Sequence, residues 1–312
     1  MEKLVDDKLM QFRPDTLEAV RNDINLDARR MNEAVDILAS WVLMQHHFVK
    51  KDFSRDYLER TLITAKGLVE RAKERLDKLC TFKTLMPEYF AVSDVKKEFS
   101  SLTEILSTAH MPKLTSEHYR VYVSKVVSDK QLDSKILFTF FRYILQCEYV
   151  KRVEYCAGFI VVLDYSDMNV MNFMTKVNPV EFRQIITIMT EGFGLRIKGI
   201  HVITESKMVD TLVTLLKQVF STKLGNRIQI HKTKESIHKV VSKELLPSDF
   251  GGNEKPLKDI HSDWIDAMSS SDFQDYFKAM NQAKTNESFR QTDKFNDSYV
   301  GMPGSFRTLS VD

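Results

Sequence analysis

GFGLRIKGIHVITESKMVDTLVTLLKQVFSTKLGNRIQIH, residues 192–231, contains the pattern that decides the fold. Its apolar run GIHVI has little alternation, which is typical of a strand buried on both faces of a sheet. The segment 206–223 that follows has helical periodicity, and RIQIH alternates apolar residues as a short strand does. A strand, a helix and a second strand in this order predict a βαβ unit with a parallel sheet.

The same alternation of strands and helices extends through most of the chain. YRVYVSKVV is rich in β-branched and aromatic residues, and GFIVVLDY is a second apolar run; both predict strands. Asn178 and Pro179 are good residues for the start of a helix, and Gly194 is a good residue for its end. The predicted strands and helices before and after the opening stretch are 119–127, 133–150, 158–165, 178–194 and 258–280.

The first hundred residues have only helical periodicity. The segment 32–48 carries its apolar residues on one stripe, with Asn32 as the expected cap. The amphipathic stretch 54–82 contains Gly67, which we expect to separate two helices. We therefore predict an all-helical domain at 1–100.

An α/β domain at 101–282 and a polar tail at 283–312 complete the predicted organisation. The length of 312 residues fits this division, since domains have about 150 residues each. The 45 Lys and Arg residues against 43 Asp and Glu leave a net charge of only +2, so no nucleic-acid partner is expected from charge alone. Any binding of anions must come from a local patch.

The cysteines and the apolar segments predict a cytoplasmic protein. Cys80, Cys147 and Cys156 form no CxxC pair, which favours reduced thiols over a disulfide framework. The N-terminal sequence MEKLVDDKLMQF has no apolar core of a signal peptide. The longest apolar run, FIVVL, is far shorter than the roughly 20 residues that span a bilayer.

Motifs of catalysis are missing from the sequence. No G-x-G-x-x-G follows the strand at 158–165, and no Walker P-loop, G-x-S-x-G or H-E-x-x-H occurs. Asp164 at a strand end and His201 within GIHVI leave a hydrolase or isomerase as an alternative, although each is more typical of a turn or a core position. We predict no catalytic residue, no metal site and no cofactor.

The helix predicted at 206–223 is apolar around more than one face. Exposing six of its apolar side chains to water would cost about 9–18 kcal/mol, so it stays closed in solution and opens only into another apolar phase. Of the 20 Phe and 14 Met residues of the chain, 11 lie between Phe138 and Phe193 in the α/β half, where they form either ordinary core or an adaptable cavity for a bulky apolar guest.

Short motifs in both halves resemble one family in their order. The first half contains ILASWV, FVKKD, AKGLVERAKERL and MPEYF, and the second contains GFIVVLDYSDMN, FGLRIKGIHVI, FSTKLGNRIQIH and LLPSDFGG. Over residues 30–265 the chain resembles the CRAL-TRIO family of cytosolic lipid-binding proteins. It is most similar to the branch of the α-tocopherol transfer and cellular retinaldehyde-binding proteins.

The resemblance implies an α/β sandwich with a mostly parallel sheet, which encloses one hydrophobic ligand under a helical gate at 205–222. The gate residues it implies are Met208, Val209, Val213, Val219 and Phe220. The ligand-pocket positions it implies are Phe138, Phe141, Leu145, Phe159, Leu163, Met171, Ile185, Ile188, Met189, Phe193, Ile197, Ile200, Leu212 and Leu216.

A basic cleft for phosphoinositide headgroups is also implied by the resemblance. Its residues would be Arg196, Lys198, Lys223 and Arg227, which on sequence grounds alone could be solvated charges at the ends of elements. The expected protein is a monomeric, non-enzymatic carrier of a tocopherol, retinoid or carotenoid-like lipid. It would be cytoplasmic and peripheral at phosphoinositide-containing membranes. A phosphoinositide-sensing adaptor without lipid transfer is the alternative.

The chain departs from the family pattern at the gate and in the pocket. Gly194 stands where the family usually has Pro, and ITES at 203–206 lacks the Asn and the Pro that usually begin the gate. Losing this Pro should loosen the hinge. Phe141 and Leu145 occupy positions that are small and polar in the tocopherol branch, so the identity of the ligand stays open.

Overall fold

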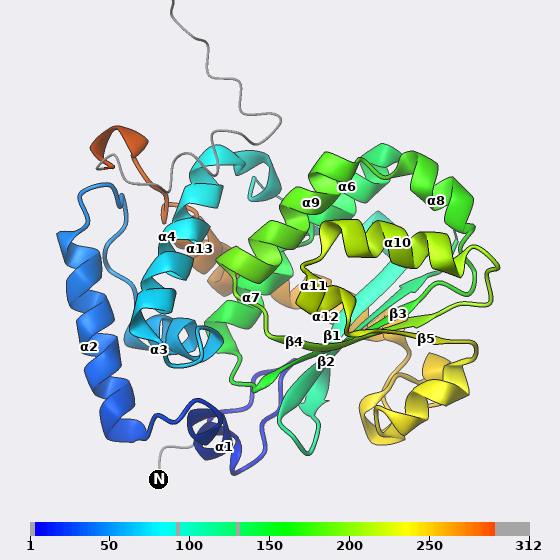
Figure 1. Cartoon of the computed structure of the whole chain (residues 1–312), viewed down its shortest axis with the longest axis horizontal. Helices are drawn as coiled ribbons and strands as arrows, with labels where there is room; N and C mark the ends of the chain where they lie inside the picture. Colours follow the sequence, from blue (N-terminus) through cyan, green and yellow to red (C-terminus); the bar gives the residue numbers. More distant parts are fainter. Residues whose placement is uncertain (1–3, 92–93, 129–131, 291–312) are drawn as a thin grey trace, which may run out of the picture.

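The computed structural model describes residues 4–91, 94–128 and 132–290 (Figure 1). Most of the predicted polar tail therefore lies outside the described residues. Its first part, 283–290, packs against the N-terminal helices. Thr285 forms a β-bridge with Phe48, and the guanidinium of Arg290 donates two hydrogen bonds to Asp77, at 2.6 and 2.7 Å.

The N-terminal part is helical, as predicted. Asp27 rather than Asn32 caps the second helix, because the extended backbone at Asp27 lets its carboxylate accept the Arg30 N–H at 2.8 Å. Gly67 separates two helices as expected, with a φ of +74° that favours glycine. The helices are α1 (Thr16–Asp23), α2 (Ala28–Met44), α3 (Arg55–Thr64), α4 (Val69–Leu85) and α5 (Val95–Phe99).

A five-stranded sheet in the order β1-β2-β3-β4-β5 forms the centre of the remaining chain. Strands β2 to β5 are parallel, which confirms the predicted βαβ architecture, and β1 pairs antiparallel with β2 at the edge. The strand β1 was not predicted, because LSTAHMPKL has few β-branched residues and contains Pro112, which edge positions and bulges tolerate. The strands are β1 (Leu106–Leu114), β2 (Tyr119–Val126), β3 (Gly158–Asp164), β4 (Ile197–Ile203) and β5 (Ile228–His231).

Several predicted helices are divided in the structure. The prediction at 133–150 is interrupted at Tyr143, the gate helix ends at Val219, and Ser270 caps a separate last helix through the Phe273 N–H at 3.3 Å. Asn178 caps its helix as predicted, and a π-helical turn at Ile188–Gly192 follows that helix. The helices are α6 (Ser134–Arg142), α7 (Leu145–Val153), α8 (Val170–Lys176), α9 (Pro179–Thr187), α10 (Val209–Val219), α11 (Thr222–Gly225), α12 (Leu257–Met268) and α13 (Ser271–Met280).

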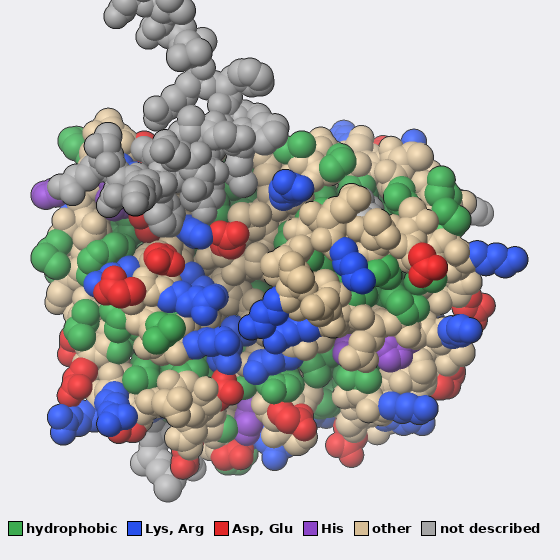
Figure 2. All heavy atoms as spheres, in the orientation of Figure 1, with side chains coloured by type: hydrophobic (Ala, Val, Ile, Leu, Met, Phe, Trp, Pro, Cys, Tyr) green, Lys and Arg blue, Asp and Glu red, His purple; other side chains and the backbone are tan. Residues whose placement is uncertain are grey.

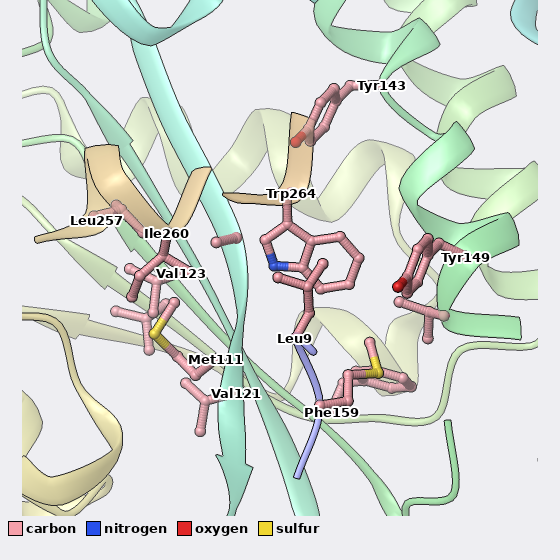
Figure 3. Close-up of a cluster of buried hydrophobic side chains, with 14 of the residues drawn as sticks. Leu9, Met111, Val121, Val123, Tyr143, Tyr149, Phe159, Leu257, Ile260 and Trp264 are labelled. Atoms are coloured by element: carbon pink, nitrogen blue, oxygen red, sulfur yellow. The ribbon is translucent and has the colours of Figure 1, made fainter. Parts of the chain in front are cut away.

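The sheet lies between two helical layers (Figure 1). Helices α6, α8, α9 and α10 lie over one face, and α12 packs against the other. On the α12 side, Trp264 is fully buried beside Val121 and Val123 (Figure 3), and its indole N–H donates to the His110 carbonyl at 3.1 Å. Among the described helices, none is both long enough and apolar enough to cross a membrane.

The N-terminal helices are joined to the α/β part by a buried ion pair. Lys83 of α4 and Glu148 of α7 lie 3.0 Å apart, and each side chain is only 1% exposed. The same ammonium donates to the Met280 carbonyl at 2.9 Å. Because a buried charge is stable only when it is paired and hydrogen-bonded, this contact fixes α4 against α7 and the end of α13.

Candidate functional site

An apolar cavity of about 170 Å³ lies between the sheet and helices α6, α9 and α10. Alternation along β3 directs Phe159, Val161 and Leu163 toward this cavity, while Ile160 and Val162 face the opposite side. A β-bulge in β4 pairs Phe159 with Ile197 but Ile160 with Gly199. The extra residue explains why both Ile197 and Ile200 line the cavity.

Many of the predicted ligand-pocket residues meet at this cavity. They come from α6, β3, α9 and its π-helical turn, β4 and α10, elements that are far apart in the sequence. Phe220, which was predicted for the gate, lines it as well. The predicted pocket residues that line the cavity are Phe141, Phe159, Leu163, Ile185, Met189, Ile197, Ile200 and Leu216.

Other predicted pocket residues lie elsewhere. The break after α6 turns Leu145 into the core around Trp264, and Phe138 packs on the Tyr89 ring, with 5.4 Å between centroids. Met171 is half exposed on α8.

The remaining predicted pocket residues are buried outside the cavity lining. Ile188 packs among Leu79 and Phe82 of α4, since the π-helical turn rotates it away from the sheet. Phe193 lines a second, smaller chamber, and Leu212 is buried on the inner face of α10. For these residues, the apolar pattern of the sequence predicted that the side chain is buried, but it did not predict toward which part of the core the side chain points.

Further residues line the cavity that the sequence did not indicate as pocket positions. Val161 could have been found from the alternation of Phe159 and Leu163, whereas His110 could not, since β1 was not predicted. The apolar residues in this group are Phe140, Ile144, Cys147, Val161, Tyr165, Phe182, Ile186 and Leu195. The polar ones are His110, Tyr122, Ser124, Tyr143, Gln146 and Thr190.

The polar groups of the cavity are neutral at physiological pH. Burial, with a contribution from Arg120, lowers the pKa of His110 to about 3, and burial raises the pKa of Tyr165 to about 12. The hydroxyl of Tyr143 is buried and has no hydrogen-bond partner within the described residues. This hydroxyl can therefore form a hydrogen bond with a polar group of a ligand, while the apolar walls suit the uncharged hydrocarbon part of the ligand.

Helix α10 covers the cavity. Leu212 and Leu216 face inward, with 0% and 3% of their surface exposed, and Phe220 follows at the end of the helix. Val219 packs partly against the cluster around Ile185, and Met208 is exposed. The remaining predicted gate residues, Val209 and Val213, are half-buried.

The predicted basic cleft is partly engaged by the protein itself. Arg196 pairs with Asp23 at 2.6 Å, and the guanidinium of Arg227 donates to the Ile197 carbonyl. The ammonium of Lys198 lies 4.7 Å from the centroid of the Tyr119 ring, and its pKa is lowered by burial and by the charge of Arg196. Lys223 is exposed.

Cations of the N-terminal helices extend this cleft, and sequence reasoning missed them. The charge of Lys223 is the main cause that lowers the pKa of Lys66, and burial followed by the charges of Arg71 and Arg196 lowers the pKa of Arg75 to about 10. Such mutual effects require proximity. Lys and Arg side chains gather in the middle of the face in Figure 2. We call Lys66, Arg71, Arg75, Arg196, Lys198, Lys223 and Arg227 the basic surface.

The alternative catalytic residues are occupied by structural contacts. Asp164 pairs with Lys234 at 3.1 Å, and His201 Nδ1 shares a hydrogen bond of 3.0 Å with His231 Nε2. Across the described residues, no three His, Cys, Asp or Glu side chains gather in a group that could hold a metal ion.

Comparison with known proteins relates the central part of the chain to one domain family. Residues 108–252 match the CRAL/TRIO domain model, as the motifs indicated. Human alpha-tocopherol transfer protein-like is 25% identical over 117 residues, 37% of this chain and 34% of that protein. Rat clavesin-1 is 28% identical over 119 residues, 38% of this chain and 33% of that protein. The chain thus spans about a third of the length of the curated relatives it matches.

A solved structure, the crystal structure of Sfh5, superimposes with a TM-score of 0.46 at 10% identity. The superposition covers 80% of this chain and 92% of Sfh5.

Proposed function

Since residues 108–252 form a CRAL/TRIO domain of the lipid-binding and lipid-transfer family, we propose that this protein is a non-enzymatic lipid carrier. It encloses one bulky hydrophobic lipid and releases it at membranes that contain phosphoinositides. The observation that carries the proposal is the apolar cavity of about 170 Å³ beneath α10, which has neutral polar groups and no charged side chain in its lining. Tocopherol-like, retinoid-like and carotenoid-like lipids are the ligand classes to test first.

The energetics of α10 favour a carrier that stays closed in water. Moving Leu212, Leu216 and Phe220 from the interior into water would cost roughly 5–9 kcal/mol, at about 1.5–3 kcal/mol for each side chain. The headgroup region of a membrane receives apolar side chains at much lower cost. Exposed Met171, Val180 and Met208 are further apolar groups on the gate helix and on α8 and α9.

The basic surface supports docking on anionic membranes. Near an anionic bilayer each Lys or Arg contributes about 1 kcal/mol. The cations of the predicted cleft, Arg196, Lys198, Lys223 and Arg227, would therefore contribute roughly 4 kcal/mol. The N-terminal cations Lys66, Arg71 and Arg75 add to this attraction. Docking alone does not open α10, but it holds the molecule where opening is least costly.

The proposal is tested by native mass spectrometry of the purified full chain, followed by organic extraction. A single lipid bound at 1:1 stoichiometry and recovered unchanged supports the carrier. An empty protein that still binds phosphoinositide vesicles would instead support the phosphoinositide-sensing adaptor, which the basic surface alone could serve. The domain division at 1–100 and 101–282, the monomeric state and the peripheral cytoplasmic location stay predictions.

A further inference from the structure

A second chamber of about 40 Å³ lies next to the apolar cavity. It is bounded by α3, α7, the start of β3 and the segment before β4, and its lining includes the charged residues Arg60, Lys151, Glu154 and Arg196. The two spaces share Cys147, Phe159 and Leu195 in their walls. A ligand in the apolar cavity therefore has one end beside a cationic space.

The cations of this chamber are only partly neutralised by the protein. Arg60 has a distant partner in Asp56, at 3.9 Å, and Arg196 pairs with Asp23 at 2.6 Å. Both carboxylate oxygens of Glu154 accept hydrogen bonds from Arg120, at 2.6 and 3.0 Å, so Glu154 is already compensated.

Lys151 is a buried basic side chain that has no counterion in direct contact among the residues that the structure describes. Its side chain is buried, and within the described residues it has no hydrogen bond and no ion pair. Its Nζ lies 5.1 Å from the centroid of the Tyr57 ring. Burial, followed by the charges of Arg75 and Arg60, lowers the pKa of Lys151 well below its usual value, and Glu148 is the smallest of the named causes and acts in the opposite direction. An anion bound beside Lys151 would favour its charged form. A buried ammonium is stable only when an anion is near it.

Two further donors in the chamber also lack partners. Nε of Arg60 and Nη1 of Arg196 are buried without a hydrogen bond in the described part of the chain. Buried donors are nearly always satisfied in folded proteins, so unpaired ones mark a place for a group that the protein alone does not supply. An acceptor with several lone pairs would satisfy these donors and the Lys151 ammonium together.

We propose that this chamber binds the carboxylate head of a lipid whose apolar chain fills the neighbouring cavity. The proposal rests on the proposed carrier function and specifies its ligand as an acidic lipid. The volume of about 40 Å³ accommodates roughly three water-sized groups, which is the size of a carboxylate. The neutral walls of the larger cavity suit the chain, because they offer no counterion to a charged head.

The shared wall between the two spaces contains no charged side chain. Cys147 and Leu195 are small or flexible, so a head can pass between them with a change of side-chain rotamer. Lys151 and Arg60 are not part of the basic surface that faces the membrane, whereas Arg196 belongs to both. Substitutions of Lys151 and Arg60 should therefore affect binding of the lipid head without affecting binding to the membrane.

The experiment measures binding of oleate, oleyl alcohol and inorganic phosphate to the delipidated full chain by isothermal titration calorimetry. The two lipids have the same chain and differ only in the head. Charge-assisted hydrogen bonds should make oleate bind about tenfold tighter than the alcohol, or more. In Lys151→Met this preference should fall several-fold, because one of the three donors is lost, with the affinity for oleyl alcohol unchanged.

Lys135→Met is the matched control, because it removes the same charge from an exposed position on α6. Its preference for oleate should equal that of the wild type. Arg60→Gln provides a second test in the chamber, and thermal unfolding verifies that each variant is folded.

Three results would overturn the inference. Equal affinity of the wild type for oleate and oleyl alcohol would exclude a head site but leave the carrier function intact. Binding of inorganic phosphate that depends on Lys151, without preference for oleate, would make the chamber a site for free anions. Failure of both lipids to bind to a folded protein that still binds retinol would overturn the inference and leave the carrier function intact, whereas failure to bind retinol as well would refute the carrier function.

Discussion

Leu216 of α10 offers the most direct test of the gate. Its side chain lines the cavity and is 3% exposed, so it would enter water if α10 swung out as the proposed gate requires. Alanine retains only a small part of this apolar surface. Leu216→Ala should therefore reduce the free energy that keeps α10 closed by about 2 kcal/mol. Since each 1.36 kcal/mol changes a rate tenfold, release of a bound lipid should become about 30-fold faster.

The assay follows the transfer of retinol, which is fluorescent, from the loaded full chain to phosphatidylcholine vesicles that contain a quencher. Vesicles without phosphoinositides keep docking from contributing to the rate. Thr214→Ala is the control, because Thr214 lies on the exposed face of the same helix and its hydroxyl donates only to the Asp210 carbonyl, at 2.8 Å. The control should release retinol at the wild-type rate.

The reasoning fails if Leu216→Ala and Thr214→Ala release retinol equally fast. The lipid would then leave by a path that does not displace α10. Because a buried Leu→Ala change also destabilises a fold by about 2–5 kcal/mol, circular dichroism must show that the variant is fully folded at the assay temperature. Faster release from a partly unfolded sample would not count as opening of the gate.

Three further predictions concern the basic surface, a buried histidine and the buried ion pair. Arg196→Ala combined with Arg227→Ala should weaken binding to phosphoinositide vesicles about 30-fold in a sedimentation assay and leave retinol binding unchanged; unaltered vesicle binding would remove the basic surface from the mechanism. His110 has a pKa of about 3 in the folded protein, so its contribution to stability is complete above pH 6.5 and declines as the pH falls toward 3. At pH 5 the free energy of unfolding, measured with urea, should be roughly 2 kcal/mol lower than at neutral pH because of His110. The variant His110→Asn should not show this decrease. Lys83→Met should destabilise the fold by about 3–5 kcal/mol by leaving Glu148 unpaired, whereas the double change with Glu148→Leu should recover most of the loss in the same unfolding measurement.

Local patterns were sufficient to predict most strands and helices. The doubly buried runs GFIVVLDY and GIHVI became β3 and β4, and Asn178 with Pro179 marked the start of α9. These signals depend on near neighbours along the chain, which the sequence displays directly. The strand β1 was not predicted. Its stability comes from pairing with β2, a contact that the composition of β1 itself does not encode.

The pocket was harder to predict because the direction of a side chain depends on small changes in backbone geometry. A turn at Tyr143 rotates Leu145 out of the cavity, and a π-helical turn redirects Ile188. The bulge at Lys198 lets Ile197 and Ile200 face the same way. Each of these features shifts the periodicity of a helix or a strand, so the side chains after it point in directions that the regular period does not give. Periodicity read across such a feature assigns the wrong face.

The basic surface could not be predicted completely, for a different reason. Its motif residues lie close together in the sequence, whereas Lys66, Arg71 and Arg75 come from the turn after α3 and from α4. Lys66 adopts a left-handed backbone with a φ of +60° just before Gly67, and its pKa depends chiefly on Lys223. Only the packing of the N-terminal helices against the α/β part brings these charges together.

The segment before the proposed gate shows how a departure from a family motif can be compensated locally. Ser206, at the position of the usual proline, donates its N–H to Thr204 Oγ1 at 3.1 Å, a bond that proline cannot form. Ser206 Oγ in turn accepts the Met208 N–H at 3.2 Å, and the Thr204 N–H extends the sheet to the His231 carbonyl at 2.9 Å. Hydrogen bonds of about 0.5–1.5 kcal/mol each thus hold the segment that a proline ring would fix covalently. The expected loosening therefore depends on these bonds, because a segment held in this way would gain freedom only if they broke when the proposed gate opened.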